Sequence, residues 1–314
     1  MRSLREAAFY QWEKGKFFGG AYLLAHRIKV RLYKYLSDED CLRKIYKKKL
    51  NKELNLDNPK TFNEKLQWLK LYNRRPEYTM MADKCAVKQY VTGKIGSEYV
   101  VPLLGVWNDF DDIDFAALPE QFVLKCNHDC GSIVICRDKK TFDYDATRKK
   151  LTRCLKRNYY WEGREWPYKD IPPKIIAEEY LDSGNGQPPV DYKYFCFRGE
   201  PKIMFIATDR GIDTKFDFYD MDFNHLEFVH GHPNANAALE KPEKFEEMRS
   251  LATVLSNGIP FVRVDFYNIN GRIYFGEYTF FHWGGLMPFV PENWDYTLGS
   301  WLTLPEKQGL KRLS

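Results

Sequence analysis

The stretch "FVRVDFYNINGRIYFGEYTFF", residues 261–281, reads as two apolar strands joined by a tight turn. Each strand carries one carboxylate among side chains that otherwise suit a core: Asp265 in the first strand and Glu277 in the second. Side chains alternate between the two faces of a strand. The turn therefore decides whether the two acids share a face and form a polar site on a buried sheet.

Two turns fit the residues between the strands. A two-residue loop, Asn270-Gly271, would place the acids on opposite faces of the hairpin. A three-residue loop, 269–271, with Gly271 in the left-handed bulge position, pairs Arg263 with Glu277 across the hairpin. We favour the three-residue loop. The polar patch that it predicts consists of Arg263, Asp265, Glu277 and Thr279.

Such a pair of carboxylates needs a positive group nearby, because like charges held side by side repel each other. A magnesium ion that bridges to phosphate oxygens, with oxygen ligands at ~2.1 Å, would meet this need. In the alternative, Arg263 pairs with one acid and the other faces water. The hairpin alone leaves both interpretations open.

The remaining pattern predicts an α+β fold. Thr61 and Glu64 stand at capping-box spacing at the start of a helix over 61–73, and a second helix is expected over 83–93. Period-two apolar segments then predict strands, and two further helical stretches interrupt them. The expected strands lie within 99–107, 122–128, 174–181, 191–208, 216–223 and 261–281, and the expected helices within 141–160 and 234–256.

Length and composition fit a folded protein of two lobes. The chain has 314 residues, 44% of them hydrophobic and 29% charged. The start, "MRSLREAAFY", contains an acid where a signal peptide would be apolar. The seven cysteines are odd in number and include no C-x-x-C pair, which indicates reduced thiols in a cytoplasm rather than disulfides or zinc.

The net charge of +5 is concentrated in one segment. Residues 27–52 hold ten Lys or Arg and three acids, so the remaining chain is mildly acidic. This balance argues against a nucleic-acid-binding protein. The segment, with its interleaved Tyr and Leu, is expected either to contact an anionic membrane surface or an acidic partner, or to be an ordinary solvated helix face.

Two lysines are placed to meet phosphates. Lys125 ends the apolar strand "FVLK", and a short loop with Gly131 and Ser132 follows it. A lysine in that position can contact nucleotide phosphates while the amides of the loop cover them. Lys84, at a helix start, is a second candidate.

Two acidic groups are placed to meet the rest of a nucleotide. "IIAEEYL" ends a strand with Glu178 and Glu179, where backbone and carboxylate can hold an adenine amine. "DYKYFCF" puts Asp191 and Lys193 on one strand face, at a spacing that suits one ribose hydroxyl and one phosphate. Taken singly, each acid reads better as an ordinary surface carboxylate.

Taken in order, these pieces resemble the ATP-grasp superfamily. The whole chain resembles the TupA-like ATP-grasp family, which is found with surface-polysaccharide synthesis. The similar stretches are "NPKTFNEKLQWLKLYNR", "YVVPLLGVW", "GREWPYK", "IIAEEYL", "FVRVDFYN" and "WDYTLGSW". The resemblance covers roughly residues 50–305. It implies a helical, basic region over 1–80, a small subdomain with a phosphate-binding loop over 81–175, and a large subdomain with a metal site over 176–314, the two subdomains gripping ATP between antiparallel sheets.

The resemblance also implies a role for each candidate residue. Those implied to hold ATP are Lys84, Lys125, Gly131, Ser132, Glu178, Glu179, Asp191 and Lys193. Those implied to hold magnesium, with two ions expected, are Asp265, Glu277 and Thr279. Arg263 and Lys193 are implied to serve catalysis, and His282 is a candidate general base or part of an acceptor pocket.

The reaction implied is an ADP-forming amide ligation through an acyl phosphate, as part of capsular or cell-surface polysaccharide biosynthesis. The expected partners are a carboxylate on a small molecule or glycan, by analogy a uronic acid, and an amine. One rival is a metal-dependent glycosyltransferase that uses Asp220-x-Asp222. A second rival is a non-catalytic adaptor recruited to the inner membrane surface through residues 27–52.

Overall fold

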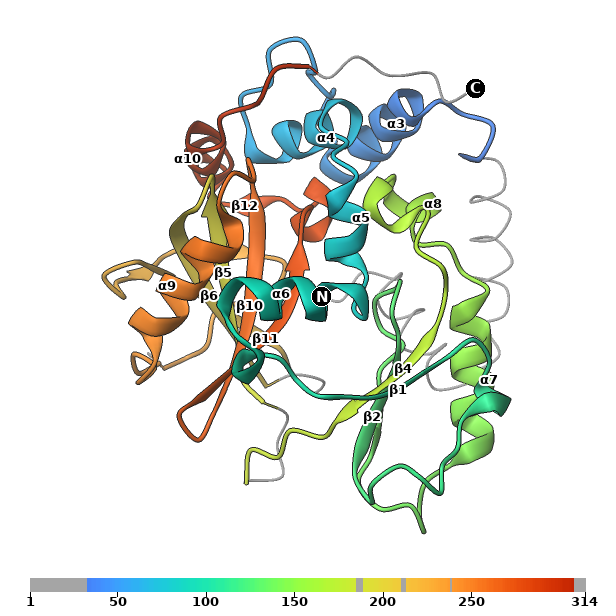
Figure 1. The fold of residues 1–314 in the computed structure, drawn as a ribbon. Helices are drawn as coiled ribbons and strands as arrows, with labels where there is room; N and C mark the ends of the chain where they lie inside the picture. The colour runs from blue at the N-terminus through green and yellow to red at the C-terminus, as the bar shows by residue number, and fades with distance from the viewer. Residues whose placement is uncertain (1–32, 185–188, 210–212, 238, 308–314) are drawn as a thin grey trace.

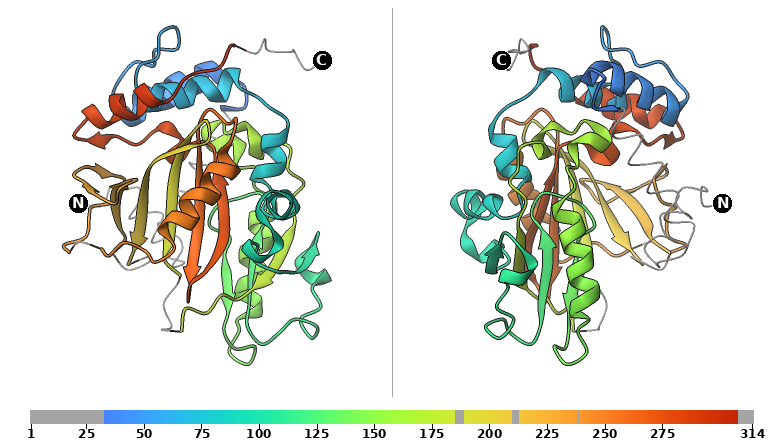
Figure 2. Two further views of the ribbon diagram at one scale, coloured as in Figure 1. Left: turned by 60° about the vertical axis from the view of Figure 1, so that its left-hand side comes forward. Right: turned by 90° about the vertical axis from the view of Figure 1, so that its right-hand side faces the viewer.

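The computed structural model describes residues 33–184, 189–209, 213–237 and 239–307. Two antiparallel sheets, one of four strands and one of six, lie beside each other, with helices packed around them (Figures 1 and 2). A two-stranded ribbon, β12 with β9, completes the strands in this part of the chain. The α+β class expected from the sequence is confirmed.

The four-stranded sheet has the order β1-β4-β2-β3. Helix α7 (Tyr144–Leu155) covers one of its faces, and its Leu151 packs with Phe122 and Leu124 of β2. Asp143 caps this helix by accepting from the Ala146 N–H. The strands are β1 (Leu103–Trp107), β2 (Phe122–Cys126), β3 (Val134–Cys136) and β4 (Ile175–Glu179).

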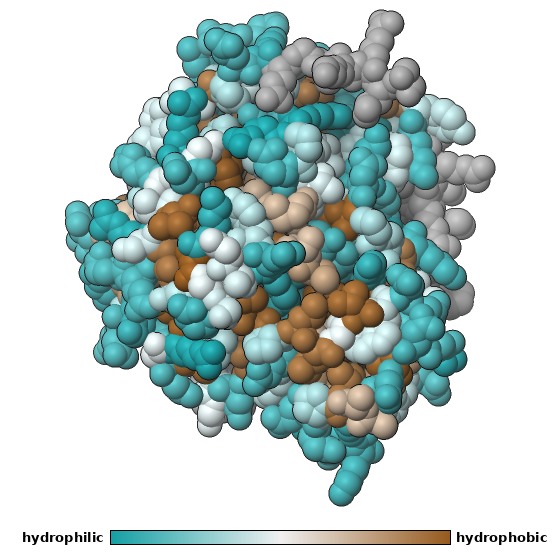
Figure 3. All heavy atoms as spheres, viewed as in Figure 1, coloured by the Kyte–Doolittle hydropathy of each residue, from teal (hydrophilic) through white to brown (hydrophobic). Residues whose placement is uncertain are grey.

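The opposite face of the small sheet is not covered in this way. Lys125 and Val123 of β2 lie on that face, because they alternate with the buried Leu124. Figure 3 shows apolar side chains gathered over the lower part of the molecule, where Figure 1 draws this sheet. The large apolar residues that are exposed on or near its strands are Leu103, Leu104, Val106, Ile133 and Ile135.

The six-stranded sheet has the order β11-β10-β5-β6-β7-β8. Helix α9 (Phe245–Ser256) packs on one face, where the Tyr194 hydroxyl donates to the Phe245 carbonyl at 3.2 Å. The opposite face carries the charged side chains described below. The strands are β5 (Asp191–Phe197), β6 (Glu200–Thr208), β7 (Lys215–Asp220), β8 (His225–Leu226), β10 (Val262–Ile269) and β11 (Arg272–Thr279).

The remaining described elements lie around the two sheets. They are α3 (Asp38–Leu50), α4 (Phe62–Tyr72), α5 (Glu77–Ala82), α6 (Ala86–Ile95), α8 (Tyr160–Gly163), β9 (Val229–His230), β12 (Phe289–Val290), α10 (Asn293–Trp301) and the 3₁₀ turns η1 (Ser97–Tyr99), η2 (Phe110–Asp112), η3 (Trp166–Tyr168) and η4 (His282–Gly285).

The N-terminal helices share one core with the large sheet. Phe62 of α4 lies 4.8 Å, ring centre to ring centre, from Phe261, and it also packs against Phe195 of β5. Helix α4 begins with the predicted capping box of Thr61 and Glu64. Helices α3, α4 and α10 form a layer at one end of the molecule (Figure 2).

The boundary between the sheets differs from the one expected at residue 175. Strand β4 pairs with β1 and β2, so residues 176–179 belong to the small sheet, and the large sheet begins with Asp191. Because the apolar pattern of "KIIAEEYL" gives no partner, the sequence does not reveal which sheet this strand joins.

Helix α3 turns its apolar residues inward. Leu42, Ile45 and Tyr46 are buried, while Lys44 and residues 47–49 are exposed. The interleaved apolar residues of this helix are therefore core residues, and only its charges face water. None of the helices in the described part of the chain combines the length and the apolar character that a bilayer crossing requires. The part of the basic segment before residue 33 lies outside the described residues.

Candidate functional site

The hairpin has a different turn from the one that we favoured. Ile269 pairs directly with Arg272, so the loop has two residues, Asn270 and Gly271. Their φ angles of 53° and 76° are both positive, as a type I′ turn requires. The prediction of a three-residue loop was wrong, because the local Asn-Gly preference determines the turn.

The two acids nevertheless share a face, because a bulge in β11 reverses the effect of the shorter loop. Val264 pairs with Tyr278 and Phe266 with Phe275, so Gly276 and Glu277 both stand opposite Asp265. The extra residue flips the alternation beyond it. Arg263 consequently pairs with Thr279 rather than with Glu277. The predicted polar patch is present in a register that we did not predict.

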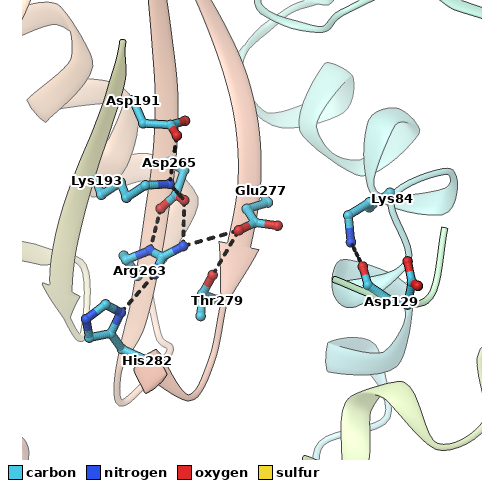
Figure 4. Close-up of polar contacts among 9 residues, drawn as sticks. All are labelled: Lys84, Asp129, Asp191, Lys193, Arg263, Asp265, Glu277, Thr279 and His282. Atoms are coloured by element: carbon cyan, nitrogen blue, oxygen red, sulfur yellow. Dashed lines mark hydrogen bonds and ion pairs between the residues drawn. The ribbon is translucent and has the colours of Figure 1, made fainter. Parts of the chain in front are cut away.

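Arg263 is at the centre of this patch (Figure 4). Its Nε and Nη2 donate to the two carboxylate oxygens of Asp265, both at 2.6 Å. Nη2 also donates to Glu277 Oε1 at 3.2 Å, and Nη1 to His282 Nδ1 at 2.8 Å. Two parallel bonds to one carboxylate are the strongest geometry available to an arginine, so the guanidinium plane is fixed.

Lys193 supplies a second positive charge to Asp265. The two residues are paired across β5 and β10, and Lys193 Nζ forms an ion pair with Asp265 Oδ2. Lys193 Nζ also lies 3.5 Å from Asp191 Oδ2. Burial would raise the pKa of Asp265, but Arg263 and Lys193 outweigh it and hold that pKa below its usual value. Asp265 is therefore an ionised carboxylate with 1% of its surface exposed.

Glu277 is the accessible acid of the pair. Its side chain is 40% exposed, and Thr279 Oγ1 lies 3.5 Å from its Oε1. In this structure Arg263 thus pairs closely with one acid while the other faces water, which is the simpler of the two interpretations of the hairpin. Among the described residues, no group of three or more His, Cys, Asp or Glu side chains is arranged to hold a metal.

The donor set still fits a magnesium–nucleotide site. One nitrogen, Arg263 Nη2, lies within 3.2 Å of an oxygen from each acid, so the two carboxylates point toward the same region. Magnesium prefers oxygen ligands and is usually held by one or two carboxylates together with substrate phosphates. Asp265 and Glu277 provide those two carboxylates, and Thr279 provides a hydroxyl beside them.

His282 is a neutral, buried histidine. Arginine N–H groups only donate, so its Nδ1 is the acceptor and its Nε2 carries the proton. Burial lowers the pKa of His282 well below the usual value, and the charge of Arg263 lowers it further. The only lone pair of the ring is used by Arg263. The geometry therefore favours a positioning role for His282, which holds Arg263 in place, and does not favour the role of general base.

Lys84 and the loop after β2 form one unit on the small subdomain. Lys84 Nζ donates to the carbonyl of Asp129 at 2.5 Å. The carboxylate of Asp129 is turned inward and accepts from Ser132 Oγ at 2.6 Å, and Ser132 Oγ in turn accepts from the Cys126 N–H at 2.8 Å. The Ser132 hydroxyl is therefore occupied within the loop. Gly131 adopts a φ of 92° in open space, where a side chain would be strained.

Lys125 and Glu178 are joined across β2 and β4. Lys125 Nζ lies 2.5 Å from Glu178 Oε2, and Lys88 of α6 lies 2.7 Å from Glu178 Oε1. Burial would raise the pKa of Glu178, but the two lysines lower it below the usual value. The neighbouring Glu179 is exposed, and its N–H donates to the Pro102 carbonyl at 3.1 Å. Lys88 is a member of this set that the sequence did not reveal, since nothing in "DKCAVKQYV" distinguishes it from a surface lysine.

Electrostatic effects link the charged residues of the hairpin with the loop of the small subdomain. Cys130, in the loop of the small subdomain, has an exposed side chain in a densely packed surrounding; that surrounding raises the pKa of its thiol, the charge of Glu277 raises it further, and Lys84 and Arg263 act in the opposite direction. The loop therefore lies close to the acids of the hairpin. This arrangement brings the predicted phosphate-binding and metal-binding groups to one region between the two sheets.

Helix α4 contributes a buried polar face that the sequence analysis missed. Asn63 donates to Met287 O at 2.9 Å, and Gln67 donates to Gly284 O and Gly285 O at 2.9 and 2.7 Å. Their spacing along the helix is the only sequence signal, because residues three or four apart share a face. This face holds η4, and with it His282, against the strand patch.

Asp220 and Asp222 have a different environment. The Asp220 carboxylate accepts from the N–H groups of Asp222 and Asn224 at 3.0 and 2.8 Å, and from the Asn224 amide at 2.9 Å. These bonds belong to the turn between β7 and β8. They lower the pKa of Asp220 even though its burial acts in the opposite direction. The D-x-D triplet thus reads as a turn motif.

The family model described as TupA-like ATPgrasp matches residues 64–303, which is most of the 314 residues. The chain belongs to the TupA-like ATP-grasp family. Its two antiparallel sheets are accordingly those of the α+β ATP-grasp fold. Among proteins of curated function, no sequence match was found.

Several solved structures are similar to this chain. D-alanine–D-alanine ligase from Helicobacter pylori is 14% identical, with 79% of this chain and 68% of that chain covered and a TM-score of 0.42. The same ligase from Bacillus anthracis, complexed with ATP, is 16% identical, with 64% and 53% covered and a TM-score of 0.37. N5-carboxyaminoimidazole synthetase from Staphylococcus aureus is 15% identical, with 64% and 44% covered and a TM-score of 0.38. This chain spans about half the length of the last two.

Proposed function

We propose that this protein is an ATP-dependent carboxylate–amine ligase that forms an amide and releases ADP. The observation that carries the proposal is the convergence of the Asp265 and Glu277 carboxylates on one face of the hairpin, with Lys193 beside them and Lys84 and Lys125 on the small subdomain. Membership of the ATP-grasp family supports the same activity, and the solved ligases to which the chain is similar include one complexed with ATP.

The nucleotide would lie between the two sheets. Lys84, Lys125 and Lys193 are suited to the phosphates, and Asp191 to a ribose hydroxyl. The backbone of the 127–132 loop, with Gly131 and the main chain of Ser132, is suited to cover the phosphates. Glu178 and Glu179, at the end of β4, are suited to the adenine edge.

Magnesium would be held by Asp265 and Glu277, with Thr279 as a further oxygen donor, and would offset phosphate charge when bound. The protein's own part is mainly to position the reactants and to neutralise charge. The carboxylate of the substrate takes the γ-phosphoryl group of ATP, which gives an acyl phosphate and ADP. The amine then attacks the acyl carbon, and phosphate leaves.

Arg263 is suited to stabilise the oxygen that becomes negative in that second step. Four of its five N–H groups are engaged with Asp265, Glu277 and His282, which fixes its plane and leaves one Nη1 hydrogen for a ligand. A preorganised donor of this kind costs no reorganisation at the moment of reaction. His282 then serves by holding Nη1 in place.

By family analogy, the acid is a uronic acid on a sugar nucleotide or polysaccharide, and the role is in capsular or surface polysaccharide synthesis. Residues 27–52 remain a candidate for peripheral contact with a membrane or an assembly partner. Their exposed lysines on α3 support such a contact only through charge, because the apolar residues of that helix are buried.

The test incubates the protein with MgATP, uronic-acid sugar nucleotides and a panel of amines. Mass spectrometry should detect an adduct that has lost one water, and ADP rather than AMP should accumulate. Asp265→Asn and Glu277→Gln should abolish both signals, while Asp222→Asn, on an exposed turn, should preserve them. Accumulation of AMP, or an adduct that forms without ATP, would overturn the proposal.

The same variants separate the rivals. A glycosyltransferase that uses Asp220 and Asp222 would lose sugar transfer in Asp222→Asn while retaining ATP turnover. The hydrogen bonds that hold Asp220 within its own turn do not favour that rival. An adaptor would show no change in melting temperature with MgATP, whereas a ligase should be stabilised by it.

A further inference from the structure

Glu165 is a buried carboxylate that the proposed chemistry above does not use. It stands between α8 and η3, within the stretch "GREWPYK", and 8% of its surface is exposed. Within the described residues its carboxylate accepts no hydrogen bond and forms no ion pair. Buried carboxylates are normally paired, because an isolated buried charge is costly. An unpaired one therefore points to a missing partner.

Lys70 is the nearest candidate for that partner, and it is already fully used. Its ammonium group donates to Gln67 Oε1 at 3.1 Å and to the carbonyls of Gly163 and Gly284, both at 2.8 Å. An ammonium group has three hydrogens. Lys70 thus influences Glu165 only through its charge, and the oxygens of Glu165 stay available.

Glycines border Oε1 of Glu165. A Cβ atom added to Gly163 or to Gly284 would lie 3.4 Å from that oxygen. Any longer side chain at either position would occupy the space beside the carboxylate. Gly284 also has a φ of 63°, which favours glycine at this position.

Two tyrosines connect this carboxylate with the strand patch. The charge of Glu165 is the largest cause that raises the pKa of Tyr159, and for Tyr168 it is second to burial. The pKa of Tyr168 also responds to Glu277 and Arg263. The Tyr168 ring lies 5.2 Å from that of Tyr159, and the charges of both Glu165 and the strand patch act on its hydroxyl.

We propose that Glu165 binds the ammonium group of the second substrate, a primary amine, and accepts its proton. This assignment rests on the proposed ligase activity and names the site of its nucleophile. A buried, unpaired carboxylate bordered by two glycines offers an ammonium group one charge partner, oxygen acceptors and little steric hindrance.

The proton balance of the step is complete. The ammonium group gives one proton to the Glu165 carboxylate, and the neutral nitrogen attacks the acyl phosphate carbon. The C–N bond forms as the C–O bond to phosphate breaks. The second proton lost from nitrogen leaves with the phosphate, so the products are an amide and hydrogen phosphate.

The charges around Glu165 suit this role. Burial raises the pKa of Glu165, Lys70 of α4 acts to lower it, and Glu162 of α8 acts to raise it again. The charge of Glu165 in turn raises the pKa values of Tyr159 and Tyr168. A carboxylate with a raised pKa is a better proton acceptor for an amine than an ordinary glutamate is.

Binding of simple amines tests the assignment without knowledge of the acid. Ethanolamine, glycine and L-lysine are each tested beside their N-acetyl derivatives. In the derivatives every amine, including both amines of lysine, is acetylated and carries no charge. Saturation-transfer NMR should detect at least one of the amines and none of the acetylated forms. Glu165→Gln should weaken that binding at least tenfold, and Tyr168→Phe several-fold. Asp170→Asn, an exposed acid of the same segment, should leave it unchanged.

The pH dependence and the nucleotide separate the possible failures. Amine binding by the wild type should decline as pH falls through the raised pKa of Glu165, at a less acid pH than for an ordinary glutamate. If Glu165 only balances Lys70, Glu165→Gln lowers the melting temperature while amine binding stays equal to wild type, and the proposal fails. It also fails if no amine binds the wild type. Amine binding without any stabilisation by MgATP would instead overturn the ligase and leave an amine site.

Discussion

His230 should make the fold lose stability in mild acid. The ring is 1% exposed, stacks on Phe289 at 3.8 Å and donates from Nδ1 to the Pro288 carbonyl at 3.2 Å. Its Nε2 is buried without a partner among the residues described. Burial lowers the pKa of His230 from 6.5 to about 3. The unfolded chain therefore takes up a proton below pH 6.5 that the folded chain refuses until about pH 3.

The size of this effect follows from proton linkage. Each pH unit below the unfolded pKa costs about 1.4 kcal/mol for one such group, so His230 should lower the free energy of unfolding by about 1.4 kcal/mol at pH 5.5 and about 2.7 kcal/mol at pH 4.5. His282 and His128, whose pKa values burial also lowers, act in the same direction. Glu165 acts in the opposite direction, because its raised pKa lets the folded state take up a proton first.

A pair of variants isolates the contribution of His230. His230→Asn keeps a donor for the Pro288 carbonyl but cannot titrate, and Phe289→Leu damages the same ring stack without touching a titrating group. Urea denaturation at pH 7.5, 5.5 and 4.5 gives the free energy of unfolding of each protein. The penalty of His230→Asn should shrink by about 1.4 kcal/mol between pH 7.5 and 5.5, while that of Phe289→Leu should stay constant. A penalty of His230→Asn that is independent of pH would refute the reasoning.

Three further outcomes are expected from substitutions or pH. Gly299→Ala should lower the free energy of unfolding by several kcal/mol, because the new Cβ would lie 2.2 Å from the Lys60 carbonyl oxygen. Gly93→Ala has open space around it and should raise the free energy of unfolding by up to about 1 kcal/mol. Equal effects of the two variants in urea denaturation would contradict this reasoning. Lys70→Met should lower the free energy of unfolding by about 2–4 kcal/mol, because the Gly163 carbonyl loses its donor and the Gly284 carbonyl keeps only Gln67, and a neutral result in calorimetry would count against this. Asp265 has a lowered pKa, so its stabilising effect should be complete above its unfolded value of 3.8 and fade as pH falls below it; acid titration of Asp265→Asn should show less of this loss than wild type.

Local rules predicted the local structure of this chain well. The capping box of Thr61 and Glu64 depends on four consecutive residues, and it forms as expected. The Asn270-Gly271 turn also follows a local preference. The three-residue loop was predicted in its place because that loop alone would put both acids on one face. The bulge in β11 is what places both acids on one face. Gly276 indicates this bulge in the sequence, since glycine within a strand often marks a bulge.

Local sequence rules could not predict which charged residues pair with each other. Glu178 was predicted as part of an adenine-binding hinge, and the structure shows it between Lys125 and Lys88. Lys88 comes from a helix more than 80 residues away in sequence, so no local pattern connects the two. The buried polar face of α4 has the same origin, because Gln67 becomes buried only when η4, more than 200 residues later, docks on it.

Charge balance bears on how many metal ions the nucleotide would bring with it. The strand patch holds three carboxylates and two cations, an excess of one negative charge, and the facing subdomain holds three lysines and two carboxylates, an excess of one positive charge. The groups counted are Asp191, Asp265, Glu277, Lys193 and Arg263, and then Lys84, Lys88, Lys125, Asp129 and Glu178. A site that is neutral overall gains least from a ligand that carries a large net charge, because burying unbalanced charge is costly. ATP with four negative charges and two divalent cations is neutral, whereas ATP with one such ion is not, so we propose that the site takes the doubly loaded nucleotide.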